Sequence, residues 1–376
     1  MTGGRHARHA LIDWFDQDTL KQLRIVVVGA GAVGNEVLKN LALLGVGQID
    51  VHDLDTIEVH NLTRSVLFRE GDVGQPKATC AAARARELDP SVGVTPFVGD
   101  FWRTLKLAEV ANASVVFCCV DNFEARIRLN RLCAIARTPL LNIGIDSRFA
   151  VVEHFPFSGV HSGPCYECAL PAAVYAALSR RYSCGWLRRV AVAEKKVPTT
   201  ILTSSAAASL AISVYLRSLH DATEPAATRY FEDTATGATT RGGIAQLEGC
   251  PGCSDLQDDR VIVRASRRID GRLVDLLGVA ALGQVVFSDR VLVHLRCPAC
   301  EADQPPVVVF ASADRYDDTI ARCPACGTAR EIELRDQFSA AELLRDYRNH
   351  DLPGKFLVSC LEDGPQVFVE LEGDDA

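Results

Sequence analysis

The chain has 376 residues, of which 48% are hydrophobic and 23% are charged, and its formal net charge is −8. This composition is typical of a globular protein with room for two or three domains. Because no block of basic residues offsets the acidic balance, a nucleic-acid partner is disfavoured. The longest apolar segment, 203–219, is short and contains Arg217, so it favours a buried or interface helix over a membrane span.

Residues 1–22 are predicted to form an arm followed by a short helix that begins near Asp18. The arm carries no apolar signal core. Eight of the 14 cysteines fall in four C-x-x-C pairs, a pattern that favours metal binding in a reducing compartment over disulfides. From these two features we expect a cytoplasmic protein.

A nucleotide-binding unit is predicted directly after the arm. The apolar run 25–28 predicts a strand buried on both faces. Gly29, Gly31 and Gly34 follow in G-x-G-x-x-G spacing, and residues 36–44 then show helical periodicity. Glycines in such a turn let the backbone approach phosphates, and the N-terminus of the helix supplies N–H donors.

The next strand, 48–52, ends on Asp53, near the spacing expected for a carboxylate that accepts ribose hydroxyls. Asn61 and Arg64 follow in the motif N-L-x-R, and Lys77 ends the motif G-Q-P-K. A dinucleotide needs no cations from this side. A triphosphate that loses pyrophosphate does need them, because they neutralise the developing charge. These residues therefore favour ATP over NAD or FAD.

The motifs D-x-D-x-I-x-x-x-N-L-x-R and G-Q-P-K-A together resemble those of the ThiF/MoeB and ubiquitin-activating enzyme superfamily, over about residues 5–253. Members adenylate the C-terminal glycine of a ubiquitin-fold protein. The resemblance implies ATP and Mg²⁺ as cofactors, a homodimer, and an arm arginine that reaches the ATP of the partner subunit. Arg8 fits that arginine best, and Arg5 is the alternative.

Strand and helix patterns alternate after Lys77, which predicts an α/β fold with a doubly wound, mostly parallel, Rossmann-like sheet. The predicted elements are a helix at 77–88, strands at 92–98 and 114–120, a helix at 123–136, and strands at 140–145 and 149–155. Asp121 follows a buried strand and is the candidate Mg²⁺ ligand, a role that the resemblance also implies. Its other reading is the N-cap of helix 123–136.

The four C-x-x-C pairs predict two structural zinc sites. One set has the spacing C-x-x-C-x22-C-x-x-C, which is typical of a zinc ribbon. The other two pairs are distant in sequence, and alone either could be a redox pair. The resemblance implies that they close on one zinc ion. The distant pairs are Cys165/Cys168 and Cys250/Cys253, and the ribbon pairs are Cys297/Cys300 and Cys323/Cys326.

Cys184 is the candidate nucleophile. It lies in a predicted crossover loop between the first zinc pair and residues 197–200. Nearby cations lower a thiol pKa and favour the thiolate, and the flanking cations are Arg180, Arg181, Arg188 and Arg189. The resemblance implies that Cys184 accepts the ubiquitin-fold protein as a thioester. The other readings are an incidental surface thiol and a member of the family that stops at the adenylate.

Two domains are expected, 1–257 for adenylation and 258–376 for an α+β domain that contains the zinc ribbon. Residues 221–248, rich in Ala, Thr and Gly, are predicted to be an exposed connector. The second domain is predicted to contain strands at 261–263, 284–287, 331–334, 356–360 and 366–371, and a helix at 339–347. No rhodanese-type domain is evident there, and recruitment of a conjugating enzyme is a hypothesis for its role.

The sequence thus predicts ATP-dependent adenylation of a ubiquitin-like protein, then thioester formation on Cys184 and transfer to a conjugating enzyme. One alternative is adenylation of a sulfur-carrier protein for molybdopterin or thiamine synthesis. A second is an NAD- or FAD-dependent oxidoreductase, which Arg64 and Lys77 disfavour. A third is a non-catalytic adaptor. No nucleic-acid or membrane partner is expected.

Overall fold

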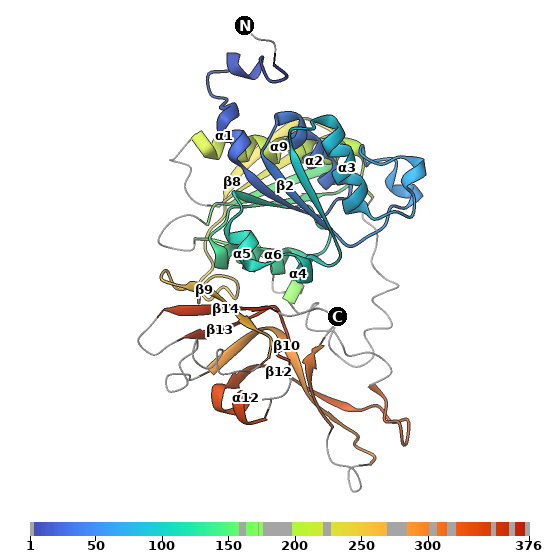
Figure 1. Cartoon of the computed structure of the whole chain (residues 1–376), viewed down its shortest axis with the longest axis vertical. Coiled ribbons are helices and arrows are strands. Elements are labelled where there is room, and N and C mark those ends of the chain that lie inside the picture. The colour runs from blue at the N-terminus through green and yellow to red at the C-terminus, as the bar shows by residue number, and fades with distance from the viewer. Residues whose placement is uncertain are drawn as a thin grey trace. The chain divides into compact units, whose positions relative to one another are not determined.

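The structure is a computed structural model of the whole chain (Figure 1). It describes residues 4–157, 163–171, 173–175, 198–220, 227–268, 284–300, 307–313, 321–346, 351–360 and 365–372. The chain divides into two compact units, Met1–Leu256 and Gln257–Ala376. The two units are described separately below.

The first unit is built on an eight-stranded sheet with the order β3-β2-β1-β4-β5-β6-β7-β8. The strands from β3 to β5 are parallel, and β6, β7 and β8 continue the sheet in antiparallel pairing. The prediction of an α/β fold with a mostly parallel, doubly wound sheet is confirmed. The strands are β1 (Arg24–Val28), β2 (Gln48–Asp53), β3 (Gly93–Val98), β4 (Val115–Cys118), β5 (Leu140–Ile145), β6 (Phe149–Phe155), β7 (Thr228–Asp233) and β8 (Ala238–Gly243).

Helices cover the two faces of this sheet. On one face α9 packs against α2, β5 and β6, and α2 packs against α3. On the other face α6 packs against β4, β5 and α5 (Figure 1). The helices are α1 (Gln17–Gln22), α2 (Ala32–Leu44), α3 (Lys77–Leu88), α4 (Phe101–Thr104), α5 (Leu107–Ala111), α6 (Phe123–Ala136) and α9 (Ile201–His220).

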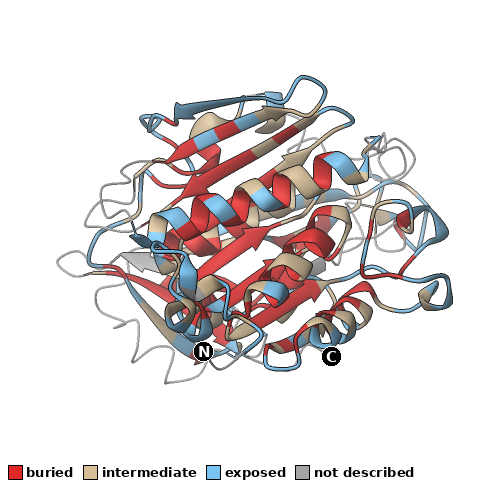
Figure 2. Cartoon of the chain, turned by 90° about the horizontal axis from the view of Figure 1, so that it is seen from above, coloured by how far each residue is buried: buried red, intermediate tan, exposed pale blue. Residues whose placement is uncertain are grey.

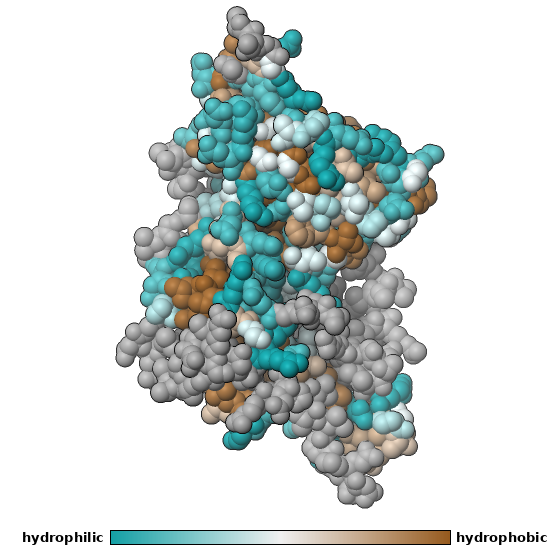
Figure 3. All heavy atoms as spheres, viewed as in Figure 1, coloured by the Kyte–Doolittle hydropathy of each residue, from teal (hydrophilic) through white to brown (hydrophobic). Residues whose placement is uncertain are grey.

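The main core lies between the sheet and the α2–α9 layer. Strands β1 and β4 are buried along most of their length, as their β-branched and aromatic residues predict. Figure 2 shows this buried band along the central strands and on the inner sides of the helices. On the face drawn in Figure 3 the described residues of the first unit are mostly hydrophilic, with separate small apolar areas. Among the described helices, none has the length and apolarity to cross a bilayer.

The prediction that residues 221–248 form an exposed connector is wrong. Strands β7 and β8 form a hairpin that pairs with β6 and extends the sheet. The segment was misread because β8 has the sequence ATTRGG and is exposed along its whole length, so it shows no alternation of apolar and polar residues. Residues 234–237, which looked like a loop, are the turn of this hairpin.

The second unit contains a six-stranded sheet in which β10 pairs with β11, β12 and β13, and β14 joins β13 to β9. The expected strands and helix are present, and β11 is an additional strand. Ser339 caps the helix, since its hydroxyl accepts a hydrogen bond from the Glu342 N–H at 3.1 Å. The elements are β9 (Val261–Ser266), β10 (Gln284–Arg296), β11 (Val307–Ser312), β12 (Glu331–Ser339), α12 (Ala340–Asp346), β13 (Phe356–Cys360) and β14 (Gln366–Glu372).

Candidate active site and metal centres

The glycine turn lies where β1 ends and α2 begins. Gly29 has φ +96°, and a Cβ there would lie 2.7 Å from the carbonyl oxygen of Cys119. A Cβ on Gly34 would lie 1.8 Å from the carbonyl oxygen of Gly29. Both positions exclude a side chain, because the backbones of β1, α2 and the end of β4 meet here.

Gly31 differs from the other two glycines because the space beside it is open. A Cβ on Gly31 would meet no atom within 4 Å, and its backbone is extended, with φ −73° and ψ −153°. Gly31 is also the N-cap of α2, and no side chain caps this helix. The N-terminus of α2 therefore presents N–H groups beside an open cradle, an arrangement that suits a phosphate.

Asp53 joins the end of β2 to the glycine turn. Its Oδ2 accepts a hydrogen bond from the Ala30 N–H at 2.6 Å, and its Oδ1 accepts one from the Asp55 N–H at 2.8 Å. Burial raises the pKa of the Asp53 carboxyl, while these two hydrogen bonds act in the opposite direction. Each carboxylate oxygen retains a second lone pair, so Asp53 can still accept hydroxyl groups of a ligand.

The position of this turn in the sheet favours a ligand crevice. Strand β1 has β2 on one side and β4 on the other, and the chain crosses to opposite sides of β1 to reach them. Ligands of doubly wound sheets bind at such a switch point, at the carboxyl ends of the strands. Gly29 follows β1 and Asp121 follows β4 at this point.

Lys77 lies near Asp53, at the first position of α3. Its Nζ forms an ion pair with Asp55 Oδ2 at 2.8 Å, and its side chain is only 11% exposed. The positive charge of Lys77 also lowers the pKa of Asp53, although burial of Asp53 has the larger effect. Asp55 was not identified from the sequence as a partner of Lys77.

The two motifs that carry these residues are held together by the backbone. Lys77 N–H donates to the Asp55 carbonyl at 2.9 Å, and Gly74 N–H donates to the Ile57 carbonyl at 2.8 Å. Thr56 and Pro76 form an antiparallel bridge between the same segments. The D-x-D-x-I and G-Q-P-K motifs are therefore one structural unit, although 16 residues, 58–73, separate them in sequence.

Asn35 is a site residue that the sequence analysis missed. It is fully buried, and its Nδ2 donates to the carbonyls of Ala30 at 2.6 Å and Gly31 at 3.1 Å. Its Oδ1 accepts a hydrogen bond from the Leu67 N–H at 2.8 Å. Asn35 thus ties the glycine turn to the segment that carries Arg64. The available signal was a polar residue on the buried side of α2, one helical turn after Gly31, although the neighbouring Glu36 is buried too.

The segment before Leu67 holds Asn61 and Arg64, the two named residues of the N-L-x-R motif. Asn61 is buried, and its Oδ1 accepts a hydrogen bond from the Glu58 N–H at 2.9 Å, so this oxygen stabilises its own turn. The Arg64 guanidinium is half-buried and donates to the His60 carbonyl at 2.8 Å. In this structure both side chains therefore contact their own loop, and neither is seen to contact Asp53 or Lys77.

Asp121 is exposed and directly precedes α6. The N-cap of that helix is Asn122, whose Oδ1 accepts from the Ala125 N–H at 2.9 Å, so the N-cap reading of Asp121 is wrong. Among the described residues, the Asp121 carboxylate accepts a single long bond, 3.5 Å, from the Asn122 amide. Oxygen ligands of this kind suit Mg²⁺.

The two candidate arm arginines have different surroundings. Arg5 donates to the carbonyl of Leu88 at 2.5 Å and lies 3.6 Å from the Asp89 carboxylate of the same chain. Arg8 is exposed and precedes a short 3-10 helix, His9–Leu11. Cys184 lies outside the residues that the structure describes, as do the four arginines that flank it in sequence.

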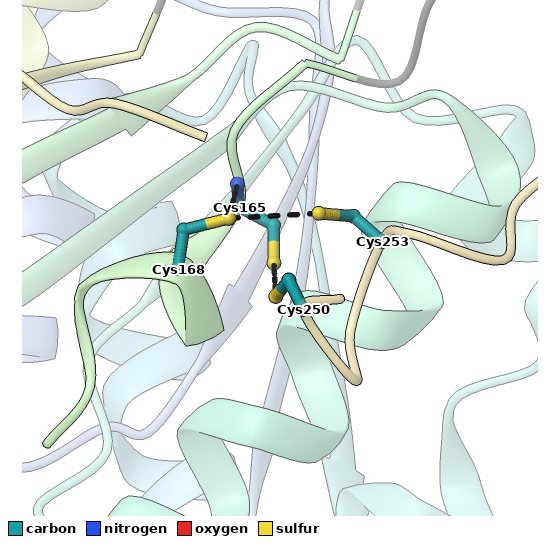
Figure 4. Close-up of side chains that lie close together, drawn as sticks. All are labelled: Cys165, Cys168, Cys250 and Cys253. Carbon is teal, nitrogen blue, oxygen red and sulfur yellow. Dashed lines mark hydrogen bonds between the residues drawn. The ribbon is translucent and has the colours of Figure 1, made fainter. Parts of the chain in front are cut away.

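The eight cysteines of the C-x-x-C pairs form two tetrads, each with its sulfur atoms within 4.8 Å of one another. In the first tetrad Cys165 and Cys250 have sulfurs 3.7 Å apart, and Cys168 and Cys253 have sulfurs 3.5 Å apart (Figure 4). The second tetrad, Cys297, Cys300, Cys323 and Cys326, has sulfur separations of 3.4, 3.5 and 3.9 Å.

These distances fit zinc. A tetrahedron with zinc–sulfur bonds of about 2.3 Å has sulfur–sulfur edges of about 3.8 Å. Four thiols also leave no open coordination position, so a metal in either tetrad would be structural. The sequence spacing could predict the second tetrad, whereas the pairing of Cys165 with Cys250 rested on the family resemblance alone.

The chain matches the sequence model of the ThiF family over residues 4–245. It belongs to the ThiF family. The match covers most of the first unit and ends before Cys250 and Cys253, so the tetrad of the second unit lies outside the matched region. The predicted resemblance to this family is confirmed.

Three curated relatives of this ThiF protein have names that refer to activation or adenylylation. The SAMP-activating enzyme E1 of Haloferax volcanii is 37% identical over 177 residues, 45% of this chain and 62% of that protein. The sulfur carrier protein adenylyltransferase of Thermus thermophilus is 37% identical over 41% of this chain and 58% of that protein. The molybdopterin-synthase adenylyltransferase of Salmonella typhimurium is 33% identical over 44% of this chain and 66% of that protein. The matched region thus spans 58% to 66% of these relatives.

Among solved structures, Escherichia coli MccB in a crystal with ATP matches 67% of this chain and 74% of its own, with a TM-score of 0.53 and 23% identity. At this identity the similarity supports the ThiF-type fold.

The glycine turn gives a first prediction. We expect Gly31→Ala to leave the thermal stability unchanged and to weaken ATP binding about tenfold or more, because its methyl group enters only the open cradle. Gly34→Ala serves as the contrasting variant, since its methyl group would collide with the Gly29 carbonyl and lower the melting temperature. Calorimetric titration with ATP and thermal unfolding check both. An unaltered ATP affinity in Gly31→Ala would contradict a phosphate cradle at this turn.

Zinc content gives a second prediction. We expect two zinc ions per chain, one for each tetrad. Cys165→Ser with Cys168→Ser should remove one zinc ion and destabilise the first unit, because the metal joins segments about 80 residues apart. The matched control, Cys297→Ser with Cys300→Ser, should remove the other ion and leave the first unit stable. Elemental analysis and thermal unfolding give both results. Retention of both ions in either variant would refute the assignment.

Proposed function

We propose that this chain adenylates the C-terminal carboxylate of a small ubiquitin-fold protein with ATP. The observation that carries the proposal is the open cradle at Gly31, at the N-terminus of α2 and beside Asp53, at the switch point between β1 and β4. Such a cradle suits a nucleotide phosphate. Membership of the ThiF family supports adenylation over the oxidoreductase reading, and the names of the relatives support a carrier or modifier protein as the substrate.

In the proposed reaction Asp53 accepts the ribose hydroxyls and the α2 N-terminus holds the phosphates. Lys77 and Arg64 offset the negative charge that develops as pyrophosphate leaves, and Asn61 orients the α-phosphate region. The carboxylate of the partner protein attacks the α-phosphate. Asp121 would bind Mg²⁺, which would add further positive charge at the phosphates.

Arg8 would act in a homodimer, by reaching the nucleotide of the second subunit. Its exposure supports this choice over Arg5, which pairs with Asp89 of its own chain. Recruitment of a ubiquitin-conjugating-like enzyme by the second unit is part of the same proposal.

A partly exposed sheet surface offers a place for the partner's C-terminal tail. On β6 and β7, Ala150, Val152 and Tyr230 belong to the core that includes α9, so Phe149 and Phe231 point to the opposite face by strand alternation. The two rings are 4.8 Å apart, and Phe231 is 37% exposed. These features suit an extended, glycine-rich tail that passes over an apolar surface toward the strand ends.

The reaction after adenylation distinguishes two readings. In the proposed pathway the Cys184 thiolate attacks the acyl-adenylate, AMP leaves, and the partner is held as a thioester. In the alternative the product is the adenylate alone, as for a sulfur-carrier adenylyltransferase, which is the name of one relative.

Pyrophosphate exchange tests the first step. We expect ATP–pyrophosphate exchange only in the presence of a cognate ubiquitin-like or sulfur-carrier protein. Lys77→Ala should reduce it by about two orders of magnitude, because charge at the leaving phosphates is lost. Lys21→Ala is the matched control, since Lys21 is an exposed lysine that pairs with exposed Asp18. Full exchange in Lys77→Ala would contradict the role of Lys77, and no exchange with any ubiquitin-fold protein would overturn adenylation.

Trapping the partner on the chain tests the second step. With ATP and the cognate protein, we expect a non-reducing gel to show a covalent adduct between the partner and this chain. Thiol reagents should cleave this adduct, because thiols attack thioesters. Cys184→Ala should abolish the adduct and preserve pyrophosphate exchange, because adenylation precedes thiol attack. Cys80→Ala, a change of a half-buried thiol on α3, is the control and should retain both. A thiol-cleavable adduct that persists in Cys184→Ala would show that another cysteine is the acceptor. Pyrophosphate exchange without any adduct would favour the sulfur-carrier reading.

A further inference from the structure

The side chain of Asn130, on α6, is fully buried next to the first cysteine tetrad. Its Oδ1 accepts a hydrogen bond from the Tyr166 N–H at 2.9 Å, immediately after Cys165 in the chain. Its Nδ2, also buried, has no hydrogen-bond partner among the described residues. A buried amide N–H without a partner destabilises the fold, so its presence here needs an explanation.

The Cys165 sulfur is a buried group beside this amide that can become an acceptor. Because Asn130 Oδ1 holds the N–H of Tyr166, the residue that follows Cys165, the same amide lies beside this cysteine. Cys165 is itself fully buried, and its sulfur lies 3.7 Å from that of Cys250. A cysteine binds zinc as the thiolate, which accepts hydrogen bonds, so a metal in the tetrad would give Nδ2 a partner.

The residues around Asn130 hold it in this position. Arg131 follows Asn130 on α6 and forms a bidentate ion pair with Glu167, at 2.8 and 2.9 Å. Glu167 lies in sequence between Cys165 and Cys168. Glu167 is fully buried and also accepts a hydrogen bond from the Tyr175 hydroxyl at 2.9 Å. Gly252 lies between Cys250 and Cys253, and a Cβ there would lie 2.4 Å from the Glu167 carboxylate and 3.0 Å from the Cys165 sulfur. The Gly252 backbone therefore packs directly against Glu167 and Cys165 and leaves no room for a side chain at that position.

We propose that Asn130 is a positioning residue of the first zinc site, whose Nδ2 donates a hydrogen bond to the Cys165 thiolate while its Oδ1 holds the Tyr166 backbone. Four thiolates around Zn²⁺ carry a net charge of about −2, which is costly in a buried site. An N–H donor withdraws some of this charge from sulfur and orients the ligand. Asn130 therefore strengthens zinc retention and touches no nucleotide. This inference needs zinc in the first tetrad and is independent of the proposed adenylation.

Two substitutions separate the two hydrogen bonds. Asn130→Asp keeps an oxygen for the Tyr166 N–H and replaces the N–H donor with an acceptor that faces the thiolate. Because a buried carboxylate is itself costly, Asn130→Ser provides a neutral second variant that cannot span both partners. Asn112→Asp is the matched control, since Asn112 is exposed at the end of α5 in the same unit. All variants are made in the full chain.

The measurement is metal release together with the absorption of the cobalt-substituted protein. To isolate the first tetrad, release to a chromogenic chelator is followed with Cys297→Ser and Cys300→Ser also present. We expect zinc release about tenfold or more faster in both Asn130 variants and unchanged in Asn112→Asp. We also expect the sulfur-to-cobalt charge-transfer band to move to lower energy, because sulfur regains electron density. A purely structural role of Asn130 would not shift this band.

The second tetrad provides an internal control. In the complementary background, Cys165→Ser with Cys168→Ser, the Asn130 variants should release the remaining metal at the unaltered rate. The inference is overturned if Asn130→Ser leaves both the release rate and the charge-transfer band of the first tetrad unchanged. It is also overturned if the release from both tetrads accelerates equally, because that result would show a general loss of stability. Failure of pyrophosphate exchange would leave these expectations intact.

Discussion

The candidate crevice depends on one close approach of backbones. At Gly29 the chain turns with positive φ against the carbonyl of Cys119, and Gly34 lets the first turn of α2 lie against the carbonyl of Gly29. A side chain at either position would separate β1 from the end of β4 or lift α2 from the turn. Backbone atoms fill the space beside Gly29 and Gly34, whereas the space beside Gly31 is open. The close backbone packing and the open cradle therefore belong to the same turn.

The parts of the site that could be predicted are those encoded locally. Strand, turn, helix and terminal acid follow one another within about 30 residues, so the sequence predicts both the glycine turn and Asp53. Asn35 could not be found in this way, because its partner Leu67 is 32 residues away and depends on the tertiary fold. Strand β8 was missed for a different reason: its residues are all exposed, so its position comes from pairing with β7 and not from a hydrophobic pattern.

The cysteine tetrads show the same contrast between local and distant information. In the second unit the two pairs lie close in sequence, and their spacing alone predicts a four-thiolate site. In the first unit the sulfur contact of Cys165 and Cys250 spans 85 residues, and much of that interval is α9 and the β7–β8 hairpin. Only the whole sheet brings these cysteines together. A metal there would fasten the end of the antiparallel extension to α6 through the neighbouring Glu167 and Arg131.

The position of Lys77 at the crevice and the ion pair that neutralises its charge depend on different interactions. The backbone bonds between 55–57 and 74–77 place Lys77 beside Asp53 without help from its side chain. The Lys77–Asp55 ion pair is different, because water reaches its carboxylate: the Asp55 side chain is 56% exposed, whereas that of Lys77 is only 11% exposed. A largely desolvated ammonium that the backbone holds in place is well suited to an anion. The fold supplies the position of Lys77, and the ion pair with Asp55 stabilises its charge. In the proposed function, a phosphate of ATP would take the place of Asp55.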